Sequence, residues 1–328
     1  MNDVTLRGTH VEIGRQLGEA LRSQNTTLPE LTERQSRYAD QLREQVEGTI
    51  PWLFEEMEGL SEAGDYDQRA TILYALSIGI VPACTVIAVA PQHTESGRTL
   101  FGRNYDAGPA WAGFTLQRTY ADGSLPHIGC FYDLLIGREG GVNEAGLAIA
   151  VTGVEGKVAP ELGLWDHIPV RAVLDRCRTV DEAVSMLTSL PHLMSKSFLV
   201  ADASGKIAIV EAAGRQVKAT QSEDGFAVIT NHFVSSEMEE FCDRSRIPAN
   251  SVSRLETAQR WFEEARGDSR AIRKADLMRL LSSTEQGVRS ELGEPFTTRW
   301  SWVSALGERT IELCDRLPDP YAYSTTHF

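Results

Sequence analysis

The feature of this sequence that most limits its fold is a change of pattern at Pro82. Before it, apolar residues recur at helical spacing, as in VEIGRQLGEALRSQ (residues 11–24). After it, short runs rich in β-branched and aromatic residues follow one another, beginning with CTVIAVA (84–90) and TLFGRNYD (99–106). The pattern therefore predicts a helical segment, residues 1–83, followed by a sheet-forming domain, residues 84–328.

The order of elements in the second part indicates the architecture. Two blocks of β-rich runs are separated by two helical stretches within residues 168–191. Two more helical stretches, 251–267 and 274–283, come before a final pair of strands within 299–317. Sheets that alternate with helix pairs bury their apolar faces best when the sheets stack and the helices cover them. We therefore predict an α+β fold, a four-layer αββα sandwich of two antiparallel sheets.

Charge and cysteine content exclude several classes of function. The net charge of −14 disfavours binding to nucleic acid or to an anionic membrane, since both need a basic surface. The N-terminus lacks the apolar core of a signal peptide. The five cysteines form no C-x-x-C pair and the seven histidines are isolated, so neither a disulfide framework, a metal site nor a cofactor is predicted. A cytoplasmic protein with reduced thiols fits these features best.

Cys84 is the candidate for chemistry because of its position relative to the next strand. If residues 84–90 and 99–106 form a hairpin around PQHTESGR (91–98), the second strand brings Arg103 and Asp106 back beside Cys84. A guanidinium near a thiol favours the nucleophilic thiolate, and a carboxylate can orient the guanidinium. The residues alone leave a second interpretation open, a buried thiol beside an ordinary Arg–Asp pair.

A thiol that attacks an amide needs a base, and no histidine is placed to supply one. An N-terminal amine, with a pKa of about 7.7–8.0, can do so instead. Cleavage of the Ala83–Cys84 bond would give Cys84 such an amine. It would also leave residues 1–83 as a prosegment, retained as a second subunit.

The sequence from Cys84 onward resembles a known family. The run from CTVIAVA to GRTLFGRNYD is similar to the start of the linear-amide C–N hydrolases of the N-terminal-nucleophile superfamily, which include choloylglycine hydrolases, penicillin V acylase and acid ceramidase-like amidases. The peptidase C45 group, typified by acyl-CoA:6-aminopenicillanic acid acyltransferase, resembles it most. GVNEAGLAIA (141–150), VITNHF (228–233) and NSVSRLE (250–256) follow in the family's order.

The resemblance implies a role for five residues. Cys84 is the nucleophile, with its own α-amino group as the base, and Arg103 and Asp106 hold the nucleophile and its amine. Asn231 offers its side-chain NH₂ to the oxyanion, and Arg254 supports the site electrostatically. Without the resemblance, Asn231 reads as a turn residue and Arg254 as a solvated helix residue.

We therefore expect an enzyme that cleaves a linear carboxamide of a small-molecule N-acyl amine through an acyl-cysteine intermediate. An acyl-CoA-dependent N-acyltransferase could use the same residues, and the sequence leaves this alternative open. A non-catalytic binding protein that keeps the fold is a second alternative. The substrate's identity, self-association into a homo-oligomer and cleavage at Ala83–Cys84 also stay open at this stage.

Overall fold

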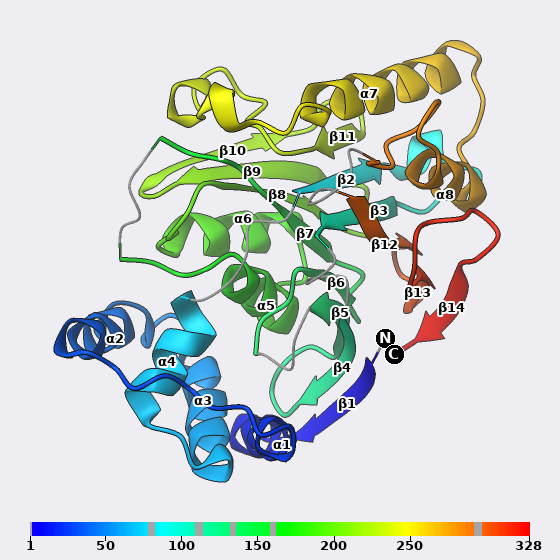
Figure 1. The fold of residues 1–328 in the computed structure, drawn as a ribbon. Helices are drawn as coiled ribbons and strands as arrows, with labels where there is room; N and C mark the ends of the chain where they lie inside the picture. The colour runs from blue at the N-terminus through cyan, green and yellow to red at the C-terminus, as the bar shows by residue number, and fades with distance from the viewer. Residues whose placement is uncertain (1, 78–82, 109–113, 132–135, 158–161, 292–296) are drawn as a thin grey trace.

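Two stacked sheets form the centre of the molecule, and helices cover both outer faces (Figure 1). The structure is a computed structural model that describes residues 2–77, 83–108, 114–131, 136–157, 162–291 and 297–328. The layers run helix, sheet, sheet, helix, so the predicted α+β sandwich is confirmed.

Among the described residues, one sheet has eight strands, and all neighbouring pairs in it are antiparallel except β1 with β4. In spatial order its strands are β1 (Asn2–Gly8), β4 (Thr115–Ala121), β5 (His127–Phe131), β6 (Gly140–Asn143), β7 (Ala148–Gly153), β8 (Lys196–Ala201), β9 (Ile207–Ala213) and β10 (Gln216–Gln221).

In the part of the chain that the structure describes, the other sheet has six strands, and all its neighbouring pairs are antiparallel. In spatial order its strands are β11 (Phe226–Ile229), β2 (Ala83–Val89), β3 (Leu100–Ala107), β12 (Thr297–Ala305), β13 (Thr310–Cys314) and β14 (Ser324–His327). The β2–β3 pair is the predicted hairpin, and its register places Arg103 opposite Val86 and Asp106 opposite Ala83.

Successive side chains of each strand point to opposite faces of the sheet, and both faces of each sheet carry buried side chains. The inner faces meet in a core that includes Cys84, Val86, Phe101 and Tyr105. Two helices, α5 (His167–Arg176) and α6 (Val180–Ser189), pack on the outer face of the eight-stranded sheet. Two others, α7 (Ser251–Gly267) and α8 (Lys274–Ser282), cover the outer face of the six-stranded sheet.

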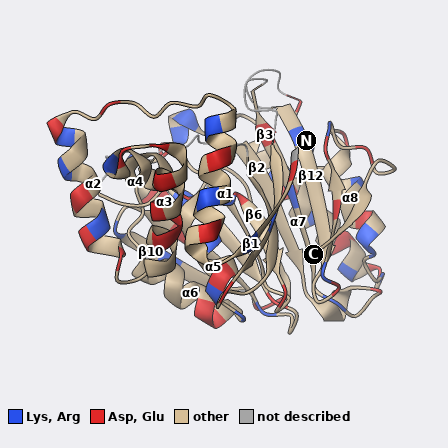
Figure 2. Ribbon diagram, turned by 90° about the horizontal axis from the view of Figure 1, so that it is seen from below, with Lys and Arg blue, Asp and Glu red and all other residues tan. Residues whose placement is uncertain are grey.

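The N-terminal segment contains the expected helices, which share an apolar core of their own. They are α1 (His10–Ser23), α2 (Glu33–Val46), α3 (Pro51–Gly64) and α4 (Gln68–Ser77). Helices α1 and α3 can approach closely because Gly14 and Gly59 have no side chain at their contact. A Cβ atom on Gly14 would collide with the main-chain oxygen of Glu56, and one on Gly59 with that of Val11. Figure 2 shows acidic and basic residues spread over α1 and α2, and acidic residues along α3.

This segment also contains a strand that the helical reading of residues 1–83 missed. Strand β1 pairs in parallel with β4 and forms one edge of the eight-stranded sheet (Figure 1). The signal for it is the alternation of Val4 and Leu6, which are partly and fully buried. The first residues of the chain are therefore built into the core sheet.

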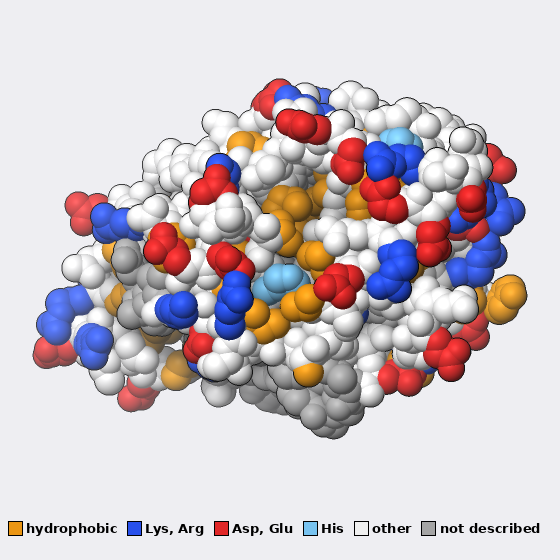
Figure 3. Space-filling view, turned by 90° about the horizontal axis from the view of Figure 1, so that it is seen from above, with side chains coloured by type: hydrophobic (Ala, Val, Ile, Leu, Met, Phe, Trp, Pro, Cys, Tyr) orange, Lys and Arg blue, Asp and Glu red, His pale blue; other side chains and the backbone are white. Residues whose placement is uncertain are grey.

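The outer surface carries both charged and apolar regions. Hydrophobic side chains and a histidine gather in a hollow near the centre of the face seen in Figure 3. In the described part of the chain, no helix combines the length and the apolar character needed to cross a bilayer.

Candidate active site

All five predicted site residues lie together at the open end of the β2–β3 hairpin, opposite its turn. Cys84 lies at the start of β2, and Arg103 and Asp106 lie on β3. Asn231 follows β11, the other neighbour of β2, and Arg254 lies in the first turns of α7. All five side chains are buried. The site therefore combines β2, β3 and the segment that follows β11 with a helix that packs behind them.

The inner face of the sheet holds the sulfur. Because side chains alternate along a strand, Arg103 shares this face with Phe101 and Tyr105. Its Nη2 atom donates to the Cys84 Sγ at 3.1 Å and to the Glu139 Oε2 at 3.2 Å. Its Nη1 atom donates to the main-chain oxygen of Glu139. The guanidinium therefore spans the gap between the two sheets and lies directly against the sulfur.

The outer side of the hairpin end holds a second group of charges. Arg254 Nη1 donates to the main-chain oxygen of Cys84 at 2.7 Å and to Thr85 Oγ1 at 2.5 Å. The same nitrogen lies 3.4 Å from Asp106 Oδ2, and Thr298 donates to Asp106 Oδ1 at 2.6 Å. Arg103 and Asp106, three residues apart on one strand, thus lie on different sides of Cys84. One contacts the sulfur, and the other is joined through Arg254 to the main chain.

Asn231 is oriented by its neighbours. Its Oδ1 atom accepts from the Cys84 main-chain N–H at 3.1 Å and from Arg254 Nη2 at 2.8 Å. Since a guanidinium can only donate, the amide oxygen must face Arg254. The amide nitrogen then points toward β7, where it donates to the Gly153 oxygen at 3.0 Å. Arg254 thereby fixes which end of the amide faces which partner.

Burial dominates the electrostatics of the site. It raises the pKa of the Cys84 thiol to about 12, although Arg103 acts in the opposite direction. Burial also raises the pKa of Asp106 to about 6, against the opposing effects of Arg254 and the hydrogen bond from Thr298. At neutral pH the thiol is therefore protonated, and it needs a base to become a nucleophile.

Three contacts of this site were not predicted from the sequence. Glu139 binds Arg103, Thr298 binds Asp106, and Ser251 accepts from the Asn231 main-chain N–H at 2.8 Å. For Glu139 the available signal was a charged residue immediately before two glycines in a β-rich region. Thr298 and Ser251 are common residue types without a local signal, so only their tertiary contacts reveal them.

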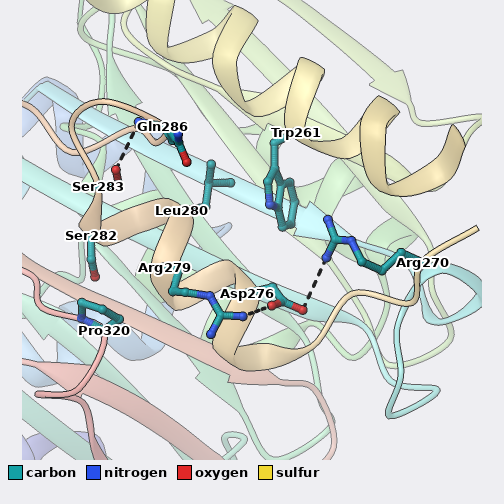
Figure 4. Close-up of a pocket in the computed structure, with 9 residues that line it drawn as sticks. All are labelled: Trp261, Arg270, Asp276, Arg279, Leu280, Ser282, Ser283, Gln286 and Pro320. Atoms are coloured by element: carbon teal, nitrogen blue, oxygen red, sulfur yellow. Dashed lines mark hydrogen bonds and ion pairs between the residues drawn. The ribbon is translucent and has the colours of Figure 1, made fainter. Parts of the chain in front are cut away.

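A surface pocket of about 500 Å³ lies apart from these residues, between α7 and α8 (Figure 4). Its lining includes Trp261, Asp276 and Leu280, and Asp276 forms ion pairs with Arg270 and Arg279. Helix α8 packs on the outer face of the six-stranded sheet. The pocket is therefore separated by that sheet from the sulfur of Cys84.

Comparisons with known proteins identify the family of the chain and structures that share its fold. The family model of acyl-coenzyme A:6-aminopenicillanic acid acyl-transferase matches residues 93–314, roughly two thirds of the chain, and begins after Cys84. No curated protein matches the chain.

Two solved structures have the same fold. The penicillin V acylase from Agrobacterium tumefaciens matches with a TM-score of 0.53 and 20% identity, over 70% of this chain and 82% of that one. A variant of the conjugated bile acid hydrolase from Clostridium perfringens matches with a TM-score of 0.56 and 13% identity, over 74% of this chain and 92% of that one.

Proposed function

Because this chain belongs to the acyl-coenzyme A:6-aminopenicillanic acid acyl-transferase family, we propose that it cleaves a linear carboxamide with Cys84 as its nucleophile. The family and the N-terminal-nucleophile hydrolase fold make it an enzyme that acts on amide bonds. The observation that carries the finer proposal is the 3.1 Å contact between Arg103 Nη2 and the Cys84 sulfur, at the first strand of the hairpin.

The proposed maturation step is cleavage of the Ala83–Cys84 bond by the Cys84 thiol. Its support is that Asn231, Arg254 and Asp106 surround the main chain at this bond. After cleavage, residues 1–83 would be one subunit and residues 84–328 the other. Strand β1 and the buried contacts of α1 and α3 would hold the first subunit in place.

The catalytic cycle follows from a protonated thiol next to a new amine. The free α-amine of Cys84 takes the thiol proton, and the sulfur attacks the carbonyl carbon of the substrate. Asn231 Nδ2 donates to the oxyanion that forms, and collapse of the intermediate breaks the C–N bond. The leaving amine takes the proton from the α-ammonium and departs, which leaves a thioester on Cys84. Water, deprotonated by the same α-amine, then hydrolyses the thioester and frees the thiol.

Two experiments test this proposal. Intact mass should show fragments that end at Ala83 and begin at Cys84, and Cys84→Ala should remain a single chain.

With a panel of N-acyl amides, mature Cys84→Ser should lose at least about a thousandfold in turnover. The matched control is Cys314→Ser, a buried cysteine on β13 outside the site, which should keep its turnover. Undiminished turnover by Cys84→Ser would disprove the nucleophile assignment, whereas no turnover of any amide by the wild type would favour the non-catalytic binding protein.

An acyl-CoA-dependent N-acyltransferase is the second candidate, favoured by the description of the matching family. It would pass through the same thioester, with an amine in place of water as the acceptor. Acylation of Cys84 by an acyl-CoA but not by an amide, detected by mass, would favour this function over hydrolysis.

Cytoplasmic location stays part of the proposal, on the basis that the five cysteines are free.

A further inference from the structure

Glu139 lies beside the eight-stranded sheet and is joined to the candidate nucleophile through Arg103. It immediately precedes β6, and its carboxylate is completely buried. Arg103 Nη2 lies between the Cys84 Sγ at 3.1 Å and the Glu139 Oε2 at 3.2 Å. One nitrogen of one guanidinium is thus shared by two groups that can each become an anion.

The neighbouring glycine gives Arg103 the room to reach across. A Cβ atom on Gly140 would lie 3.1 Å from Arg103 Nη1 and 2.9 Å from the Cβ of Ala150. Such a contact would push the guanidinium away from β6. The Glu139–Gly140 pair therefore supplies both the acceptors and the space that fix Arg103 between the sheets.

Two further buried charges lie close to Glu139, Asp166 before α5 and Lys196 at the start of β8. Lys196 Nζ donates to the Leu164 oxygen at 3.3 Å. Within the described residues, Glu139 Oε1 and Asp166 Oδ1 have no hydrogen-bond partner. Burial and Asp166 raise the pKa of Glu139, while Arg103 and Lys196 oppose that rise. The charged groups that interact with the Cys84 thiol include Arg103, Asp106 and Glu139, and also Arg254.

We propose that Glu139 is a positioning residue for the reaction proposed above: it aims Arg103 at the Cys84 sulfur and competes with that sulfur for the same guanidinium nitrogen. The proposal rests on Cys84 being the nucleophile. A guanidinium holds its donors in a rigid fork, so acceptors on Nη1 and Nη2 determine where the fork points. An ionised Glu139 offsets the electrostatic effect of Arg103 on the sulfur. With a neutral side chain at position 139, the positive charge of Arg103 stabilises a developing thiolate more strongly.

The test is the titration of Cys84 in Glu139→Gln. Glutamine can still accept from Arg103 but carries no charge, so we expect the Cys84 thiol to titrate lower by about one pH unit. The titration is read from the ¹³Cβ resonance of labelled cysteine, which needs no access for a reagent, and the Cys84→Ser spectrum assigns the signal. Glu139→Ala removes the side-chain acceptor as well. We expect it to lower kcat about tenfold with KM unchanged, and Glu139→Gln to restore kcat.

The matched control is Glu56→Gln, another fully buried glutamate bound to an arginine, Arg171, outside the site. It should leave the Cys84 titration at its wild-type position. The proposal is wrong if Cys84 in Glu139→Gln titrates at the wild-type pH or higher, or stays protonated to the same upper limit. Because the titration does not depend on turnover, it is measured even if Cys84→Ser keeps full activity, and the two proposals fail separately.

Discussion

At the scale of single residues, the site depends on Arg254 as much as on the groups nearest the sulfur. Arg254 binds the Cys84 main-chain oxygen and the Asn231 side-chain oxygen, which fixes the direction of the Asn231 amide. A preorganised donor costs little reorganisation when negative charge develops on the substrate. The contribution of Asn231 is therefore expected in the transition state and not in substrate binding.

Asn231→Ala tests this expectation. We expect kcat to fall about 100- to 1,000-fold, equivalent to roughly 3–4 kcal/mol, with a small change in KM. Steady-state kinetics on the best amide substrate measures both constants. Asn143→Ala is the control, because Asn143 donates to the oxygens of Leu174 and Cys177 and lies outside the site. It should lower stability while leaving kcat near the wild-type value. A rise in KM with unchanged kcat for Asn231→Ala would assign Asn231 to substrate binding.

At the scale of elements, buried charges join the N-terminal helices to α5. Arg171 of α5 pairs with Glu56 of α3 at 2.8 Å and with Asp175 at 3.0 Å. Two more contacts extend the network, His10 with Glu56 at 3.2 Å and Trp52 Nε1 with Asp175 at 2.9 Å. Arg171, Glu56 and Asp175 are fully buried, so each charge depends on its partners.

Arg171→Met should expose that dependence, because it leaves Glu56 and Asp175 buried without their cation. We expect the free energy of unfolding to fall by about 3–5 kcal/mol. The double variant Arg171→Met/Glu56→Met removes one of the stranded charges and should regain part of that loss. Urea denaturation followed by circular dichroism gives both values. Equal stability of Arg171→Met and wild type would mean that this network does not hold the segment in place.

At the scale of the whole molecule, burial keeps three histidines neutral in the eight-stranded sheet and in the helical layer that covers it. His127 on β5, His167 on α5 and His192 after α6 are buried, and burial lowers the pKa of each to about 3. The unfolded chain binds these protons near the ordinary histidine pKa of about 6.5. Between about pH 6.5 and 3 the unfolded state therefore holds more protons, and the folded state loses stability as the pH falls.

The urea midpoint should thus fall steeply below pH 6.5. Each of these histidines contributes up to about 1.4 kcal/mol per pH unit within that window. Urea titrations at pH 7, 6 and 5 measure the slope, and His192→Gln should make it shallower by about one proton. His192 is suited to this because its one described hydrogen bond is to the Leu187 oxygen, outside the site. A midpoint that stays constant from pH 7 to 5 would contradict the prediction.

Local pattern was enough to predict most elements of the fold. The run 251–267 is a helix with those bounds, and the strands around Cys84 and Arg103 lie within one residue of the predicted runs. Strand β1 was missed because an edge strand in front of a strong helical pattern has only two alternating apolar residues as its signal. The four-residue strands β6 and β14 were missed for a similar reason, since β6 is glycine-rich and β14 is exposed and polar.

The sequence by itself determined the αββα order of elements and the hairpin that places Arg103 and Asp106 near Cys84, because periodicity and turn residues are local properties of the chain. Only the tertiary structure decided that Arg103 reaches across to Glu139 and that Arg254 orients Asn231. It also decided that burial outweighs the arginine in the pKa of the Cys84 thiol. These outcomes depend on which side chains from distant segments lie within a few ångströms of one another and on how completely water is excluded, and neither can be read from local spacing.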